Sequence, residues 1–475
     1  MNIKLVLRLV GRVMAAESFA LFFPMAVALL YRESPVPFLL SILIILAISL
    51  PLASMRTEKH FFLREGFVSV GLIWLVTGVV GGLPFYFSGY FESFVDCIFE
   101  TCSGFTTTGA TILVDIEALP RGILFWRSFT HWLGGMGVLV LATAILPSLG
   151  VPSHYLTQAE SPGPVFSKLV PKQSQTSKIL YTIYFAMTSL EVVLLKLAGM
   201  PLYDAFIHAF STGGFSNRNA SVGAYGSPVI DMIIAVFALL FSVNFSVYFL
   251  VLHRRLKEAL KSDELRFFLG VVAAATVVIT LDLLPIYQNT LESLRYAFFQ
   301  VASIISTTGF ATADYVLWPQ LSRLVLVLLM FCGACAGSTA GGVKCSRVLM
   351  LLRAIRREIH QIAHPRSVEV VKLDGKVAEE STVHSVLVFV GCYGLILLGA
   401  ALVVSLDKMP FDVSFSAALT CLSNVGPGLA AIGPTGNFSG FSDLSKLALS
   451  LCMIVGRLEI FPILVMFSAR TWRRD

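Results

Sequence analysis

Charged residues are scarce in this sequence of 475 residues: Asp, Glu, Lys and Arg make up 13% of it, against roughly 25% in an average soluble domain. Hydrophobic residues reach 56%, and the mean hydropathy is +0.80. Several apolar runs have the roughly 20 residues that a membrane span requires, among them 66–87, 229–252 and 386–406. The shortage of charge argues against a soluble domain and indicates an all-α polytopic membrane protein.

Three kinds of chemical motif are also missing. No G-x-G-x-x-G follows a predicted strand, so a nucleotide-binding domain must belong to another chain. The histidines lack metal-ligand spacing and no nucleophile is paired with a base, which argues against an enzyme with a cofactor of its own. The eight cysteines lie mostly in apolar segments, which argues against a secreted disulfide framework. Cys332 and Cys335 form a lone C-x-x-C, which small-residue helix packing explains better than redox or metal chemistry.

The positive charges are distributed as in an inner-membrane protein. Lys and Arg gather in six clusters, all on one side of the membrane if each repeat crosses it twice: 4–12, 56–64, 168–178, 254–266, 347–366 and 470–474. This positive-inside pattern places both termini in the cytoplasm. It also explains the net charge of +6, so the charge does not indicate binding to nucleic acid. The early positive charge lacks a small-residue cleavage site, so the first span is expected to be retained.

Four short segments centred on glycine recur at intervals of about 100 residues, far above the period of common solenoids. They are Thr106–Ala110, Ser211–Phe215, Ser306–Phe310 and Ser423–Pro427. Each follows a half-length apolar helix and precedes a long apolar segment. The fourth is the most divergent, because Asn424 and Val425 replace threonines. The order predicts span, re-entrant helix, turn and span, repeated four times.

The chain is therefore divided into an accessory helix pair and four pore repeats. The boundaries are 1–60 for the pair and 61–150, 151–258, 259–376 and 377–475 for the repeats. The predicted spans are 7–31, 37–54, 66–88, 123–147, 178–199, 228–252, 266–286, 321–355, 383–406 and 443–468. The half-length helices are 91–105, 202–210, 291–305 and 411–422. The predicted fold places helix, pore helix, filter and helix four times around one central pore.

The turns have the chemistry of a cation filter. A ring of backbone carbonyls replaces the hydration shell of an ion, and glycine reaches the positive φ that such turns need. The half-length helices aim their negative C-terminal ends at the same place. These features favour potassium, with less stringent exclusion of sodium than a two-glycine filter gives. The predicted filter residues are Thr107, Thr108, Gly109, Thr212, Gly213, Gly214, Thr307, Thr308, Gly309, Asn424, Val425 and Gly426.

Acidic residues accompany the half-length helices on the non-cytoplasmic side. As a set they are expected to concentrate cations at a pore mouth. Taken singly, each is also explained as a charge that complements a helix N-terminus. The residues are Asp96, Glu100, Asp204, Glu292 and Asp412.

The segment Phe331–Lys344 is rich in glycine and interrupts a predicted span. One interpretation is a tight small-residue contact between helices. The other is a flexible loop that crosses the pore below the filter and gates it. The gate residues predicted within it are Gly333, Gly337, Ser338, Thr339, Gly341, Gly342 and Lys344.

Arg457 is a charge inside another predicted span, which marks it as a functional candidate and as the eighth gate residue. It is expected to bind carbonyls of the glycine-rich segment, or to pair with Glu459 or another carboxylate. The alternative is a structural ion pair near the membrane boundary.

The chain resembles the TrkH/TrkG/KtrB superfamily of microbial potassium uptake proteins over nearly its whole length. The segment Ser103–Thr111, the block Arg127–Gly137, the stretch Ala336–Lys344 and the surroundings of Arg457 match the family pattern. The initial helix pair is similar to the TrkH type rather than the shorter KtrB type.

The resemblance implies a homodimer in the bacterial cytoplasmic membrane, with a pore in each protomer. It also implies a cytosolic ring of TrkA-like regulatory subunits that bind the nucleotide. The resemblance further implies that potassium is the substrate and that membrane lipid surrounds the protein. The alternative function is a secondary potassium symporter coupled to protons or sodium.

Overall fold

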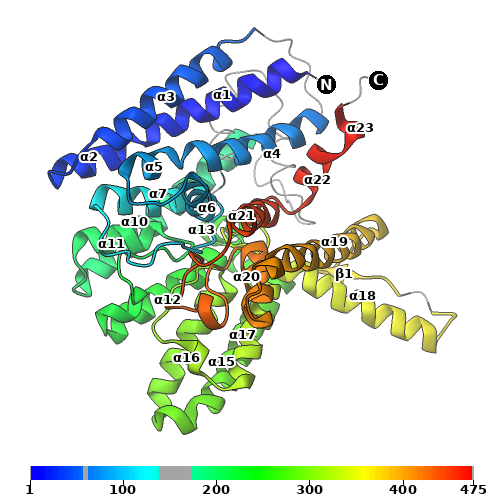
Figure 1. Cartoon of the computed structure of the whole chain (residues 1–475). Coiled ribbons are helices and arrows are strands. Elements are labelled where there is room, and N and C mark those ends of the chain that lie inside the picture. The colour runs from blue at the N-terminus through cyan, green and yellow to red at the C-terminus, as the bar shows by residue number, and fades with distance from the viewer. Residues whose placement is uncertain (1, 57–62, 136, 138–172, 368, 473–475) are drawn as a thin grey trace.

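The computed structural model describes residues 2–56, 63–135, 137, 173–367 and 369–472. Three helices come first: α1 (Ile3–Ala20), α2 (Phe22–Leu30) and α3 (Val36–Ala53). Figure 1 shows α1 and α3 side by side along one edge of the molecule. The pair corresponds to the predicted helices 7–31 and 37–54.

The remaining helices are described in four units, each with one of the helices predicted as half-length: α6, α11, α16 or α20. The first has α4 (Leu63–Val80), α5 (Leu83–Ser88), α6 (Phe94–Phe105) and α7 (Arg121–Gly135). The second has α10 (Gln173–Leu197), α11 (Leu202–Phe210), α12 (Pro228–Ser242), α13 (Phe245–Leu252) and α14 (Leu256–Ala259). The third has α15 (Asp263–Tyr287), α16 (Thr290–Ile305), α17 (Gln320–Cys332) and α18 (Cys345–Ala363). The fourth has α19 (Glu380–Val404), α20 (Phe411–Ser423), α21 (Asp443–Arg457), α22 (Phe461–Phe467) and α23 (Ala469–Trp472).

Single 3₁₀ turns and one hairpin complete the described structure. The 3₁₀ turns are η2 (Ser221–Tyr225), η3 (Tyr315–Leu317), η4 (Ser405–Asp407) and η5 (Ala430–Ile432). The strands β1 (Lys372–Leu373) and β2 (Lys376–Val377) pair antiparallel between the third and fourth units. In Figure 1 this hairpin lies beside α18, which projects away from the rest of the molecule.

The four short helices α6, α11, α16 and α20 form where they were predicted, because each has a defined start. Ser93 caps α6 by accepting a hydrogen bond from the amide of Asp96, and Asn289 caps α16 in the same way. Pro201 and Pro410 occupy the N-cap positions of α11 and α20. Each helix then ends at one of the glycine turns.

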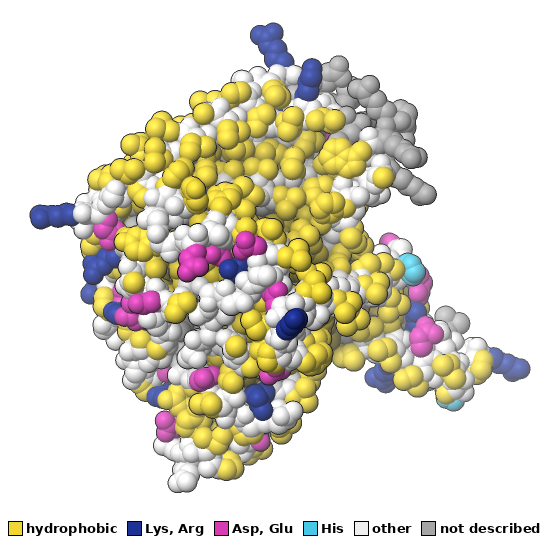
Figure 2. Space-filling model, viewed as in Figure 1, with side chains coloured by type: hydrophobic (Ala, Val, Ile, Leu, Met, Phe, Trp, Pro, Cys, Tyr) yellow, Lys and Arg dark blue, Asp and Glu magenta, His cyan; other side chains and the backbone are white. Residues whose placement is uncertain are grey.

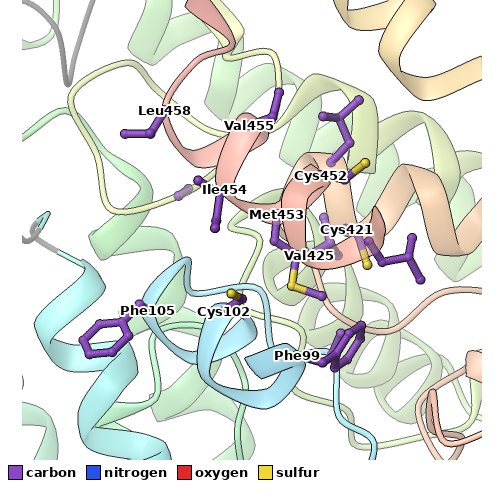
Figure 3. Packing of buried hydrophobic residues seen from close by; sticks show 14 of the residues in the cluster. Phe99, Cys102, Phe105, Cys421, Val425, Cys452, Met453, Ile454, Val455 and Leu458 are labelled. Atoms are coloured by element: carbon purple, nitrogen blue, oxygen red, sulfur yellow. The ribbon is translucent and has the colours of Figure 1, made fainter. Parts of the chain in front are cut away.

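These short helices and α21 form the core, whereas α3 and α19 line the outside. In α20 nearly every residue from Val413 to Ser423 is buried. Figure 3 shows Met453 and Ile454 of α21 pointing toward α6, which carries Cys102 and Phe105. The outer helices expose large side chains such as Leu43 and Leu398, and Figure 2 shows broad apolar surface between the charged areas. An outside of this kind suits contact with lipid.

Two predicted spans are broken, and their prediction as continuous helices is wrong. The axes of α12 and α13 differ by 93°, and those of α21 and α22 by 120°. At the first break, the amide of Phe245 donates to the carbonyl of Gly337, 3.1 Å away. At the second, Glu459 and Ile460 adopt φ of 55° and 70°. Backbone groups freed from a helix inside a membrane need partners in the protein. A distant segment supplies one at the first break, whereas neighbouring residues do so at the second.

Among the described residues, six helices are long and apolar enough to cross a membrane, or eight if each bent pair is one span. The sequence predicted ten. The predicted span 321–355 is split between α17 and α18, and the one at 123–147 begins as α7 and continues outside the described residues. The fold is thus all-helical and polytopic, with bent and re-entrant helix pairs.

Candidate functional site

The four glycine turns meet in a closed ring, here called the glycine ring. A β-carbon added to each glycine would collide with the carbonyl oxygen of the residue just before the next glycine. The distances would be 1.8 Å from Gly109 to Gly213, 2.1 Å from Gly214 to Thr308, 2.4 Å from Gly309 to Val425 and 2.4 Å from Gly426 to Thr108. Because the fourth turn returns to the first, the turns surround one axis in chain order.

In the turns, residues with positive φ alternate with residues whose φ is negative. The φ angles of the glycines are 84° at Gly109, 86° at Gly214, 81° at Gly309 and 97° at Gly426. Two residues earlier, Thr107 and Thr307 have φ of 55° and Asn424 has 56°. Glycine reaches such angles at little cost, and other residues adopt them only with strain. The strained positions recur at matching places, which indicates a common backbone design.

The second turn departs from this design. Thr212 does not share the left-handed φ of Thr107 and Thr307, and Gly213 takes the place of a threonine before Gly214. The fourth turn, which is the most divergent in sequence, has the regular backbone. Its Asn424 donates through Nδ2 to Thr108 Oγ1 at 3.0 Å and to the carbonyl of Met453 at 2.8 Å. Asn424 therefore closes the ring against the first turn.

A cavity of ≈ 90 Å³ opens on one side of the glycine ring. All four ring glycines line it, together with residues that follow them in the chain, such as Ala110, Ser216 and Pro427. Within the part of the chain that the structure describes, no Asp or Glu lines this cavity. The expected concentration of cations by an acidic mouth is therefore wrong at this cavity.

Three of the five acidic residues of the short helices are instead paired inside the protein, while Glu292 is half-buried and Asp412 is exposed. Asp96 Oδ1 lies 2.6 Å from Lys446 Nζ, with both side chains buried. Glu100 Oε1 lies 2.5 Å from Arg127 Nε. Asp204 accepts hydrogen bonds from Asn217, at 2.7 Å, and from Tyr225. These contacts lock the short helices to other elements.

The Glu100–Arg127 pair fixes the first two turns of the glycine ring to each other. Glu100 also accepts a hydrogen bond from the amide of Ile112 at 3.1 Å, beyond the first turn. Arg127 Nη1 donates to the carbonyl of Ser216 at 3.0 Å, beyond the second turn. The guanidinium carbon lies 3.5 Å from the ring centroid of Phe215. One buried charge pair therefore holds chain segments from two units.

Arg127→Ala is expected to destabilise the protein by about 3–5 kcal/mol, because it leaves the Glu100 carboxylate buried without its partner. Thermal unfolding of purified protein in detergent measures this. Arg255→Ala is the matched control, since Arg255 pairs with Glu258 at the exposed surface and exposed pairs contribute less than ~1 kcal/mol. Equal melting temperatures for the two variants would contradict a structural role for the buried pair.

The segment from Gly333 to Lys344, here called the glycine loop, lies on the opposite side of the glycine ring. It is not helical, because α17 ends at Cys332 and α18 begins at Cys345. The amide of Gly341 donates to Thr307 Oγ1 at 2.8 Å. A β-carbon on Gly341 would lie 2.4 Å from the carbonyl oxygen of Ser423. The loop thus passes against the third and fourth turns, and the alternative of a tight contact between continuous helices is wrong.

The glycine loop is tied to the break between α12 and α13. Thr339 donates to the carbonyl of Phe241 through its amide at 3.3 Å and its hydroxyl at 3.2 Å. Ser338 Oγ donates to the carbonyl of Cys335 at 2.6 Å, and Lys344 Nζ donates to that of Ala340. Gly333, Gly337, Gly342 and Lys344 have φ of 64°, 67°, 78° and 80°.

Arg457 reaches across from α21 to the glycine loop. Its Nη1 donates to the carbonyl of Thr339 at 2.5 Å. Its Nη2 donates to the carbonyls of Gly134 and Gly135 at the end of α7, at 2.6 and 2.8 Å. The contact with a carbonyl of the glycine loop, which was considered from the sequence, is present, while Glu459 pairs with Arg347. Arg457 therefore connects three units across the axis.

Glu264 is a site residue that the sequence interpretation missed. Its Oε1 accepts hydrogen bonds from the amides of Ala336 at 2.7 Å and Ser346 at 3.0 Å. One carboxylate oxygen thus holds the glycine loop and the first turn of α18. The signal in the sequence was a carboxylate at the start of a span, which a helix N-terminus explains equally well.

Comparison with known proteins gives one consistent result. The family model TrkH, described as a cation transport protein, matches residues 34–474. The Trk system potassium uptake protein TrkH of Salmonella typhimurium is 39% identical over 487 residues, covering 100% of both chains. The TrkG protein of Escherichia coli is 34% identical over 483 residues, covering 99% of both. The crystal structure of the potassium transporter TrkH from Vibrio parahaemolyticus superimposes with a TM-score of 0.89 at 35% identity, covering 100% of both chains.

Proposed function

Because this chain belongs to the TrkH family of cation transport proteins, we propose that it takes up potassium through a single-chain pore whose selectivity filter is the glycine ring. The observation that carries the proposal is the closure of four carbonyl-bearing turns around one axis in chain order. A ring of backbone carbonyl oxygens substitutes for the water around a cation. We also propose that the chain divides at the boundaries predicted from the sequence, into the accessory helix pair and four pore repeats.

The C-terminal ends of the short helices add to this environment. Each of α6, α11, α16 and α20 ends where a turn of the ring begins, so partial negative charge accumulates there without a carboxylate. This suits a weakly hydrated monovalent cation. Sodium is expected to be excluded imperfectly, because the second turn breaks the regularity of the ring.

The glycine loop is proposed as the gate, with Arg457 as its latch. The loop contacts the third and fourth turns on the side opposite the cavity, so an ion leaving the ring meets it next. Arg457 places positive charge close to this path and ties the loop to α7 and α21. Opening then requires these carbonyl contacts to be exchanged for others.

We place the protein in the bacterial cytoplasmic membrane with both termini in the cytoplasm, in keeping with the clustered positive charges. By membership of the family, we also propose that it works as a homodimer with cytosolic TrkA-like subunits. These subunits would carry the nucleotide and act on the gate. A broad outside of apolar side chains leaves room for both lipid and a second copy.

Rubidium uptake into proteoliposomes tests the function. A rubidium gradient alone is expected to drive uptake, and excess potassium to block it far more strongly than excess sodium. Adding the regulatory subunits with nucleotide is expected to change the rate. Uptake that strictly requires a proton or sodium gradient would favour the symporter instead. Liposomes without protein give the baseline for leakage of rubidium. Protein with Gly109→Ala gives the baseline for uptake without ion selectivity.

A further inference from the structure

Two thiols close the base of the glycine loop. Cys332 is the last residue of α17 and Cys345 the first of α18, and their Sγ atoms lie 3.7 Å apart. Cys345 Sγ also contacts the carbonyl of Gly333 at 3.3 Å. A disulfide has an S–S distance of about 2.05 Å, so the two sulfurs, which are already in contact, must approach further by side-chain rotation before a bond forms.

The backbone holds this arrangement in place. The amide of Val343 donates to the carbonyl of Phe331 at 3.3 Å, and that of Cys345 to the carbonyl of Ala334 at 2.9 Å. The two ends of the loop therefore run side by side, with the thiols between them. These backbone hydrogen bonds therefore keep Cys332 and Cys345 next to each other at the base of the loop.

We propose that Cys332 and Cys345 form a redox modification site that locks the glycine loop. The proposal rests on the gating role assigned to the loop above. Its oxidant is a small disulfide of the glutathione type. The thiolate of Cys332 attacks that disulfide and expels one thiol, and Cys345 then displaces the second. Two thiols of the protein lose two protons and two electrons, and the oxidant leaves as two thiols.

The environments of the two sulfurs fit this order. Cys332 is partly exposed whereas Cys345 is buried, so the reagent reaches Cys332 first and Cys345 resolves the mixed disulfide. Cys335 lies in the same loop but is buried, and its amide is held by the carbonyl of Ser242 at 3.1 Å. It provides a control thiol in the same surroundings.

The bond is expected to act on the gate because it joins the two points from which the loop leaves its helices. The loop touches Thr307 and the carbonyl of Ser423. If the loop withdraws from these contacts, the backbone between Cys332 and Cys345 must change its conformation. Fixing the ends in the present arrangement favours the conformation in which the loop lies against the ring, so the open population falls.

Oxidation of the protein in proteoliposomes tests the proposal. Oxidised glutathione is added, the disulfide is identified by peptide mass spectrometry, and rubidium uptake is measured before and after reduction with dithiothreitol. Wild type and Cys335→Ser are expected to form the 332–345 disulfide and to lose about tenfold in uptake, reversibly, if the open population falls tenfold. Cys332→Ser and Cys345→Ser are expected to keep their uptake under the oxidant.

The outcomes separate this site from the proposed function. The site is overturned if the disulfide-linked peptides of Cys332 and Cys345 are not found after oxidation, either with oxidised glutathione or with the membrane-permeant oxidant diamide. A disulfide that leaves uptake unchanged overturns the lock, while rubidium transport itself still supports the pore. If reduced wild type carries no rubidium, the pore proposal fails even though the disulfide can still be scored by mass.

Discussion

Gly109→Ala is expected to remove the preference for potassium over sodium while the protein still inserts into the membrane. The new β-carbon would lie 1.8 Å from the carbonyl oxygen of Gly213, so one turn of the ring must shift. Alanine at a φ of 84° adds strain of about 1–2 kcal/mol. Because coordination needs all four turns, a shift in one alters the site for every ion.

Competition between rubidium and sodium in proteoliposomes measures the effect. A loss of about tenfold in discrimination corresponds to roughly 1.4 kcal/mol between the two ions, and we expect at least that. Gly270→Ala is the matched control, since nothing lies within 4 Å of a β-carbon at that helical position. Wild-type discrimination in Gly109→Ala, with normal insertion, would refute the assignment of the ring as the filter.

The short helices and their turns could be predicted from the sequence because their signals are local. The prediction 202–210 for α11 is confirmed, and 411–422 differs by one residue from α20 (Phe411–Ser423). Caps at the start and glycine at the end lie within a few residues of each helix. Because four copies of this pattern occur in one chain, the sequence alone predicts that the turns form a ring.

The contacts between units could not be predicted, because their partners are distant in sequence. Asp96 and Lys446 are separated by 350 positions, and each alone has the pattern of an ordinary helix-terminal or interfacial charge. The expectation of an acidic mouth followed from treating the carboxylates as one set of charges around the pore, without their buried partners. Burial next to a base changes an attracting charge into a structural one.

The two helix breaks outside the glycine loop have the same origin. Val243–Asn244 and Leu458–Ile460 contain no glycine or proline. The local signals are confined to Asn244 at the N-cap of α13 and Pro462 in the first turn of α22, and within long apolar runs they did not outweigh the prediction of continuous spans. The first break exists because the glycine loop offers hydrogen-bond partners to residues around it, such as Phe245. The second lies where Glu459 meets Arg347. The glycine loop of the third unit thus affects the conformation of a helix in the second unit. Patterns within a single segment do not reveal such an effect.

Arg457→Ala is expected to raise the basal rate of rubidium uptake several-fold in the absence of regulatory subunits. The change removes hydrogen bonds to Thr339, Gly134 and Gly135, and hydrogen bonds from a charged donor contribute about 1.5–3 kcal/mol each. Losing the bond to Thr339 alone would favour loop release by about tenfold at the lower end of that range. Removing the positive charge also lowers the barrier to a cation beside it.

Arg457→Lys separates these two effects. Lysine keeps the charge but lacks the planar fork that reaches several carbonyls at once. If the tether holds the gate, the lysine variant approaches the alanine variant in basal uptake; if charge repulsion dominates, it stays near wild type. Discrimination against sodium is expected to persist in both, because the ring itself is unchanged. Basal uptake at or below the wild-type rate in Arg457→Ala would contradict a gate held closed by this residue, since neither its bonds nor its charge would then oppose the flow of ions.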